Sequence, residues 1–124
     1  MVIHESAEDY LESILILQEQ CGEVHSIDIV NKLGYSKPSV SIAMKKLREN
    51  GYVSMAADGT ITLNDSGMEI ASRIYSSLKT ITRLFVRMGV SSEQAAIDAC
   101  TVEHDLSQET FGSICDFAGR DENV

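Results

Sequence analysis

Two short helical patterns with a glycine between them are the feature that most constrains the fold of this chain. In residues 26–33, which Ser26 would cap, apolar side chains recur at helical spacing, and Gly34 ends the pattern. The next pattern begins at Ser36, a residue suited to a helix cap, and has Pro38 in its first turn. A helix, a short turn and another helix together predict a helix-turn-helix.

The flanking segments predict the winged form of this motif. An amphipathic helical pattern, which Ser6 would cap, precedes it. Two β-rich segments, Tyr52–Met55 and Thr60–Leu63, follow it, and an Asp-Gly step between them is typical of a hairpin turn. We therefore expect a winged helix-turn-helix domain over residues 1–63.

The remainder, residues 64–124, is predicted to be helical, so that the fold class is mainly α. A long helix is interrupted at Gly89, and two shorter helices begin at the caps Ser91 and Ser107, the last ending before Gly119. Apolar residues of the long helix alternate in steps of four and three, which forms either a core stripe or a dimer seam, and we favour the seam. The residues of this stripe are Ile74, Leu78, Ile81, Phe85 and Met88.

Length and composition limit the class of protein. A chain of 124 residues that is 44 % hydrophobic can bury a core without disulfides, but it is too short for a large catalytic barrel. No run approaches the roughly 20 apolar residues of a membrane span, and no secretory leader is legible, which predicts a cytoplasmic protein without membrane contact. Cys21, Cys100 and Cys115 fit reduced thiols, and such residues are more often small buried hydrophobes than ligands.

Positive charge gathers in one segment although the chain as a whole is acidic. The net charge is −9, but residues 31–50 carry +4 and hold half of the ten basic residues. The other 104 residues therefore carry −13. Because the net negative charge lies outside residues 31–50, the acidity of the whole chain does not exclude a DNA-binding face. No basic residue lies between Arg48 and Arg73, which leaves the predicted wing without a cation for phosphates.

The second helix of the motif presents a face suited to DNA. Successive residues of a helix are about 100° apart around its axis. This spacing predicts that one set of apolar residues faces inward and that an Ile, flanked by serines and lysines, faces outward. Hydroxyls can meet phosphates or base edges, an exposed Ile can pack on a thymine methyl group, and lysines neutralise phosphates. A charged run often only solvates a surface helix, but the winged motif favours DNA. The predicted DNA-binding residues are Ser36, Lys37, Pro38, Ser39, Ser41, Ile42, Lys45 and Lys46.

Two helical segments carry side chains that bind metals. Cys100, Glu103 and His104 lie at positions i, i+3 and i+4, so a thiol, a carboxylate and an imidazole share one face. Asp9 and Glu12 lie at i and i+3 of the first helix and add two carboxylates. Each group can also be explained without a metal. Acidic residues such as Asp9 and Glu12 are favoured near a helix N-terminus, and Cys100 could be a buried residue next to a Glu and a His on the surface.

Four runs of residues, taken together, resemble the diphtheria toxin repressor family in order and spacing over nearly the whole chain. They are Ala7–Glu12, Ser36–Ser41, Leu63–Gly67 and Cys100–Ser107, of which the last, Cys-x-x-Glu-His-x-x-Ser, is the most specific. The resemblance implies a cytoplasmic, homodimeric, metal-dependent transcriptional repressor that binds a double-stranded DNA operator. The winged domain would precede a helical metal-binding and dimerisation domain over residues 64–124. Without a third, SH3-like domain, the chain is similar to the short, manganese-sensing branch.

The resemblance also implies which residues bind metal. Asp9 matches a position that is Asp in the manganese branch and Met in the iron branch, and Glu12 matches a carboxylate ligand of the manganese branch. Cys100 instead matches the iron branch, whereas Glu103 and His104 match ligands common to both. Carboxylates with an imidazole suit Fe²⁺ or Mn²⁺, and a thiolate also admits Zn²⁺ or Co²⁺.

One departure from the family pattern leaves alternatives open. Leu78 stands where the family places a ligand His, so that the site is either completed by another imidazole, such as His4, or vestigial. A vestigial site would leave a metal-indifferent winged-helix regulator that binds DNA or protein. A hydrolytic metalloenzyme is disfavoured because the chain has no His-Glu-x-x-His run, and we expect neither catalysis nor an organic small-molecule substrate.

Overall fold

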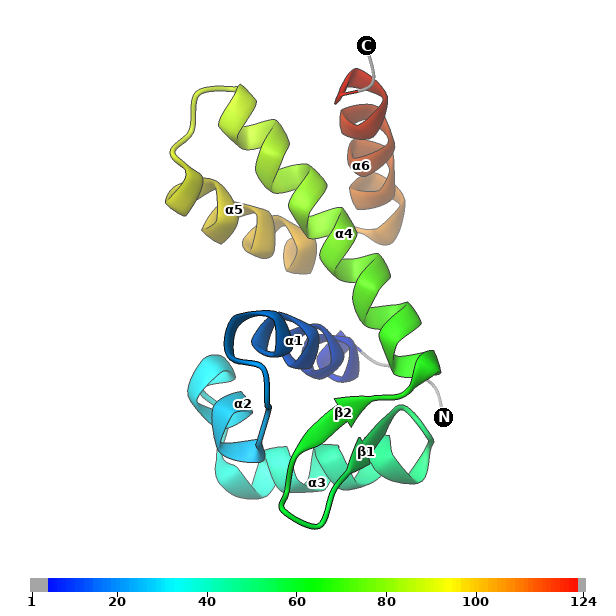
Figure 1. The fold of residues 1–124 in the computed structure, drawn as a ribbon. Coiled ribbons are helices and arrows are strands. Elements are labelled where there is room, and N and C mark those ends of the chain that lie inside the picture. The colour runs from blue at the N-terminus through cyan, green and yellow to red at the C-terminus, as the bar shows by residue number, and fades with distance from the viewer. Residues whose placement is uncertain (1–4, 123–124) are drawn as a thin grey trace. The chain divides into compact units, whose positions relative to one another are not determined.

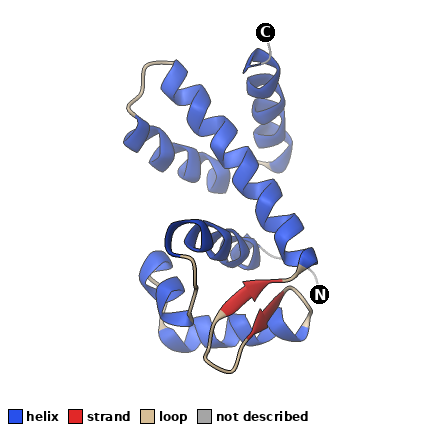
Figure 2. Ribbon diagram, in the orientation of Figure 1, coloured by secondary structure: helices blue, strands red, loops and turns tan. Residues whose placement is uncertain are grey.

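Helices dominate the part of the chain that the computed structural model describes, which is residues 5–122 without the side chains of residues 5, 6, 104, 121 and 122. Six helices and one two-stranded sheet are present in this part (Figures 1 and 2), so the predicted mainly α class is confirmed. The elements are α1 Glu5–Cys21, α2 Ser26–Leu33, α3 Lys37–Glu49, β1 Val53–Met55, β2 Ile61–Leu63, α4 Asp65–Arg87, α5 Ser92–Asp105 and α6 Gln108–Glu122.

Serine caps begin three of the helices as predicted. Ser36 Oγ accepts the N–H of Ser39 at 3.3 Å, at the start of α3. Ser91 caps α5 in the same way, and Ser107 Oγ accepts the N–H of Thr110 at 3.1 Å before α6. Each of these bonds satisfies one of the backbone donors that a helix N-terminus leaves unpaired, which explains why the helices begin there.

Three helix ends differ from the prediction. The cap of α2 is His25 and not Ser26, because the His25 N–H donates to Asp28 Oδ2 at 2.8 Å. Helix α1 begins at Glu5, so Ser6 lies inside the helix. Helix α6 continues through Gly119, since glycine lowers helix propensity but ends a helix only where the chain adopts a left-handed turn.

The wing is an antiparallel hairpin. Val53 pairs with Leu63 and Met55 with Ile61 across the two strands. Ile61 also donates its N–H to the carbonyl of Val24 at 2.7 Å, so the segment between α1 and α2 is joined to the hairpin. Periodicity could not reveal this bridge, because the contact is made by one residue.

Two compact units divide within α4, after Ile74. In the first unit, α1, α2, α3 and the hairpin enclose one core, to which each element contributes (Figure 1). Its completely buried residues include Leu11, Ile14, Val24, Ile29, Val40 and Ile61. The predicted boundary at residues 63 and 64 therefore marks the start of a helix that runs from one unit into the other.

In the second unit, the central part of the apolar stripe packs against other helices of the same chain. Leu78, Ile81 and Phe85 of α4 belong to a core cluster with apolar residues of α5 and α6. Met88 follows the end of α4 and is 70 % exposed. The central part of the stripe is thus a core stripe within the chain, the alternative that the heptad spacing had left open.

Cysteine burial also differs from the expectation. Cys21 and Cys100 are exposed, Cys115 is half-buried with its Sγ 3.8 Å from the carbonyl oxygen of Ser77, and none of the three forms a disulfide bond. Burial raises the pKa of the Cys115 thiol. Among the described residues, no helix is long and apolar enough to span a bilayer.

Candidate nucleic-acid interface and metal ligands

The outer face of α3 is built by a helix that buries its other side. Val40, Met44 and Leu47 are buried in the core of the first unit, and Ala43 is partly buried. The opposite positions reach solvent, as expected, and Ile42 is 58 % exposed. The structure therefore places the predicted DNA-binding residues on an exposed surface, namely Ser36, Lys37, Pro38, Ser39, Ser41, Ile42, Lys45 and Lys46.

Hydrogen bonds at the start of α3 orient its serines. Ser36 Oγ donates to Ser39 Oγ at 2.8 Å while it accepts the backbone N–H of Ser39. The preceding turn is held by Tyr35, whose ring packs edge-on at 5.7 Å from the ring of Tyr10 in α1. The first turn of the helix is thus fixed by the cap and by an aromatic contact to the core.

The lysines of α3 are weakly engaged within the protein. Lys45 Nζ lies 4.0 Å from Glu49 Oε1, and both side chains are more than half exposed. Exposed ion pairs of this kind contribute about 1 kcal/mol or less. A phosphate could therefore displace Glu49 as the partner of Lys45 at little cost.

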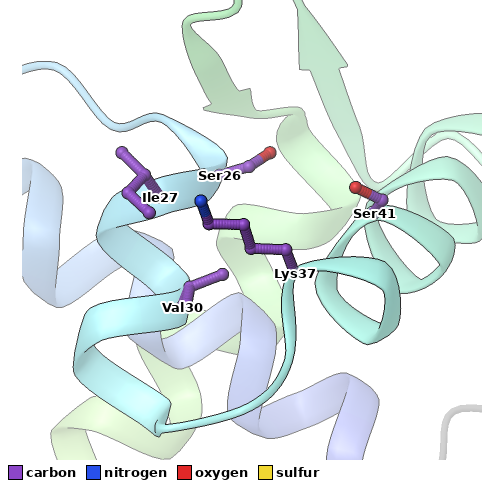
Figure 3. A pocket seen from close by; sticks show the side chains of 5 residues that line it. All are labelled: Ser26, Ile27, Val30, Lys37 and Ser41. Atoms are coloured by element: carbon purple, nitrogen blue, oxygen red, sulfur yellow. The ribbon is translucent and has the colours of Figure 1, made fainter.

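A groove between α2 and α3 was not evident from the sequence. It encloses about 330 Å³ and is lined by Ser26, Ile27 and Val30 of α2 and by Lys37 and Ser41 of α3. Figure 3 shows the Lys37 side chain reaching from α3 toward α2. Helical spacing did not separate Ile27, which is 45 % exposed, from the buried Ile29.

The wing is anchored to the start of α4 by Asn64. Its Oδ1 accepts the hydroxyl of Ser54 at 2.6 Å, and its Nδ2 donates to the carbonyl of Gly51 at 3.0 Å. At the tip, hydrogen bonding from the Thr60 N–H lowers the pKa of Asp58, which is exposed and therefore ionised at neutral pH. The wing thus presents a negative charge, consistent with its lack of basic residues.

In α1, the two candidate metal ligands lie one helical turn apart. Glu12 is only 7 % exposed and Asp9 is partly buried. The Oε2 atom of Glu12 is completely buried. A buried carboxylate is stable only when hydrogen bonds, an opposite charge or a cation compensate for lost hydration.

In α5, the candidate ligands have different surroundings. Cys100 is exposed, whereas Glu103 is partly buried and its Oε2 is completely buried. His104 belongs to the helix, but its side chain lies outside the described residues, as does all of His4. Leu78 packs in the core of the second unit, which accounts for an apolar residue at that position.

The types of the candidate ligands fit a metal ion, but the described side chains are not gathered around one point. Carboxylates, a thiol and an imidazole are the donor types that divalent transition metals take, so the chemistry of the set fits. Among the described side chains, however, no three His, Cys, Asp or Glu residues are grouped to hold an ion. Asp9 and Glu12 lie in the first unit, whereas Cys100, Glu103 and His104 lie in the second. The five-residue site stays a prediction.

Comparison with protein families matches nearly the whole chain in two adjacent segments. Residues 3–61 match the iron dependent repressor, N-terminal DNA binding domain. Residues 64–123 match the iron dependent repressor, metal binding and dimerisation domain. The order of the two matches agrees with the predicted order of the winged and helical regions.

Curated relatives are transcriptional regulators. The transcriptional regulator MntR of Salmonella typhimurium is 31 % identical over 113 residues, which cover 91 % of this chain and 72 % of that protein. The HTH-type transcriptional regulator MJ0568 of Methanocaldococcus jannaschii is 35 % identical over 107 residues, covering 85 % and 86 % of the two chains.

Solved structures share the fold. A manganese-dependent transcriptional repressor in complex with manganese is 27 % identical with a TM-score of 0.68, over 91 % of this chain and 52 % of that one. IdeR of T. acidophilum is 24 % identical with a TM-score of 0.73, over 96 % of this chain and 55 % of that one. At this identity, the likeness supports the fold alone. The chain spans about half the length of these two structures.

Proposed function

This chain belongs to the iron-dependent repressor family, and on that premise we propose that it represses transcription in response to Fe²⁺ or Mn²⁺. It is a transcriptional regulator and not an enzyme, in agreement with the sequence prediction. The proposed partners are a double-stranded DNA operator and a second copy of the chain, in the cytoplasm. We propose no organic small-molecule substrate for it.

The observation that carries the DNA-binding part is the two-sided character of α3. Its inner side is buried, which holds the helix rigidly, and its outer side exposes serines, lysines and one Ile. The +4 charge of residues 31–50 would draw this face toward phosphates despite the acidity of the whole chain. Because the wing adds no cation, affinity per subunit is expected to be modest and to fall with salt.

The metal-binding part assigns ligands to both units. We propose Asp9 and Glu12 on α1, and Cys100, Glu103 and His104 on α5, as the residues that hold the ion. When bound, a divalent cation supplies the positive charge that compensates these carboxylates and the thiolate. An operator that spans successive major grooves requires the recognition helices of a dimer to lie about 34 Å apart, and we propose that bound metal would favour this spacing.

The core position of Leu78 favours a second candidate function. If the site needs an imidazole there, metal binding is lost and the protein is a metal-indifferent winged-helix regulator. The two candidates differ in one measurable property, which is the effect of metal on DNA binding.

A gel-shift titration of the full chain tests the proposal. DNA duplexes that the chain selects from a random library are titrated in Mn²⁺, in Zn²⁺ and, without oxygen, in Fe²⁺. We expect retardation only with metal, and Glu103→Ala should require at least about tenfold more metal because a buried ligand is removed. Glu93→Ala is the matched control, since Glu93 is an exposed carboxylate on the same helix.

Three outcomes separate the candidates. Retardation that ignores metal would refute the sensor and support the metal-indifferent regulator. An unchanged metal response of both Glu103→Ala and His104→Ala would remove these residues from the site. Absence of retardation under every condition would refute the repressor.

A further inference from the structure

The recognition face of α3 lacks the side chains that best read bases by paired hydrogen bonds. Arg pairs with guanine, and Asn or Gln pairs with adenine, through two bonds each. None of these residue types occurs in residues 37–47. Arg48 follows them, but its Nη1 lies 3.5 Å from Met55 Sδ of the wing.

Lysines are the remaining cationic residues of α3 that could read guanine. Lys37 reaches across the groove toward Ile27 and Val30 of α2 (Figure 3). Lys45 lies 4.0 Å from Glu49 Oε1. Their mobile side chains suit phosphate contacts, which position the protein without reading sequence.

Ile42 is the large apolar residue on this face, and it is 58 % exposed. Single exposed apolar residues are common and mean little alone. Ile42, however, follows Ser41 and precedes Lys45 and Lys46 by about one turn, so the charges that attract phosphates would bring it against base edges. The apolar group on those edges in the major groove is the C5-methyl group of thymine.

We propose that Ile42 selects thymine in the operator by packing against its C5-methyl group. The inference rests on the proposed function, because it requires that α3 enters the major groove. It goes further in naming the base and the chemical group that are read. The operator half-site would be distinguished by methyl groups more than by guanine hydrogen bonds.

The test uses the full chain with saturating Mn²⁺ and duplexes selected from a random library. Each thymine is replaced in turn by deoxyuridine, which removes only the C5-methyl group, and the Kd is measured by fluorescence anisotropy. We expect a loss of about fourfold at one thymine of each half-site, the effect of one buried methyl-sized group. Replacing guanines by 7-deazaguanine should have a smaller effect at every position.

Variants assign the effect to one side chain. Ile42→Ala should bind the thymine and uracil duplexes equally, whereas Ile42→Val should retain part of the preference. Ile27→Ala is the matched control, because Ile27 is an exposed Ile of the same unit on α2, and it should keep the full preference. Circular dichroism verifies that these surface variants fold.

The outcomes distinguish this inference from the proposed function. Equal affinity of the unaltered chain for thymine and uracil duplexes, with sequence-selective binding retained, would overturn the role of Ile42 and leave the repressor intact. A thymine preference that survives in Ile42→Ala would overturn it as well. Failure to select any DNA would overturn both proposals.

Discussion

The two units of this chain differ in how many apolar residues their cores bury. In the first unit, helices α1 to α3 and the hairpin enclose a cluster of which Leu11, Ile14 and Ile61 are completely buried. In the second unit, the cluster centres on Ile81, Ala99 and Phe111, and most of the side chains around it are only partly buried. The first unit therefore has the larger set of buried residues, whereas the second has a small buried centre surrounded by partly buried side chains.

Exposed large apolar residues occur in both units. Among the residues that the structure describes, the first unit exposes five by 36 to 58 %, namely Ile27, Tyr35, Ile42, Met55 and Met68. The second unit exposes four large apolar side chains by 40 to 70 %, namely Val86, Met88, Ile97 and Phe117. Three of these four, Met88, Ile97 and Phe117, are more exposed than any described large apolar side chain of the first unit, which favours an interaction between subunits in line with the match to a dimerisation domain.

The largest expected effect tests whether the first core is complete. Leu11→Ala removes a fully buried side chain and should lower the free energy of unfolding by about 3 kcal/mol. Urea denaturation followed by circular dichroism measures this loss, and Glu19→Ala, on the exposed side of α1, should change it by less than about 0.5 kcal/mol. The effect on the first unit should not depend on protein concentration. If the loss shrinks as concentration rises, the first core depends on association, and the contrast fails.

A pair of glycine substitutions should have opposite signs in the two units. A Cβ on Gly67 would collide with the backbone carbonyl oxygen of Tyr52, so Gly67→Ala should destabilise the junction of wing and α4 by about 2 kcal/mol. Gly112 lies in α6 with open space around its position, so Gly112→Ala should stabilise the helix by about 0.5–1 kcal/mol. Thermal unfolding measures both changes. If both substitutions changed the stability in the same direction, the space around each glycine would not be what controls the change.

A third effect concerns association of the second unit. Phe117→Asp places a charge on a side chain that is 66 % exposed, so the monomer should still fold. If this side chain is buried between subunits, the dimer Kd should rise about tenfold or more. Sedimentation velocity measures the change, with Ile42→Asp in the first unit as the control that should not alter it. An unchanged dimer would remove α6 from the subunit interface.

Much of the fold followed from local patterns, because helix caps and turns depend on neighbouring residues. Ser36, Ser91 and Ser107 cap the helices that their positions indicated. The inward face of α3 also followed from its periodicity, since one side of a surface helix must be apolar. The failure at α2 has a local cause as well, because the side chain of Asp28 accepts the N–H of His25 and moves the cap one residue earlier.

For the candidate sites too, features of a single helix could be predicted, whereas features that depend on tertiary packing could not. The exposure of Ile42 and its neighbours could be predicted, because one helix decides it. The groove lined by Ile27 and Lys37 could not, since it needs the packing of α2 on α3. The metal ligands were indicated by spacing and by resemblance, but their convergence depends on residues far apart in the chain.

By itself, the sequence determined the order of helices and hairpin, the basic outer face of α3 and the residue types available to a metal. These properties depend on side chains within one or two turns of each other, where spacing and chemistry suffice. The tertiary structure decided that Leu78, Ile81 and Phe85 pack against residues of α5 and α6 in the core of the second unit, and that Cys100 is exposed. A heptad pattern states only that a face is apolar, and burial against a particular helix depends on the packing of the whole unit.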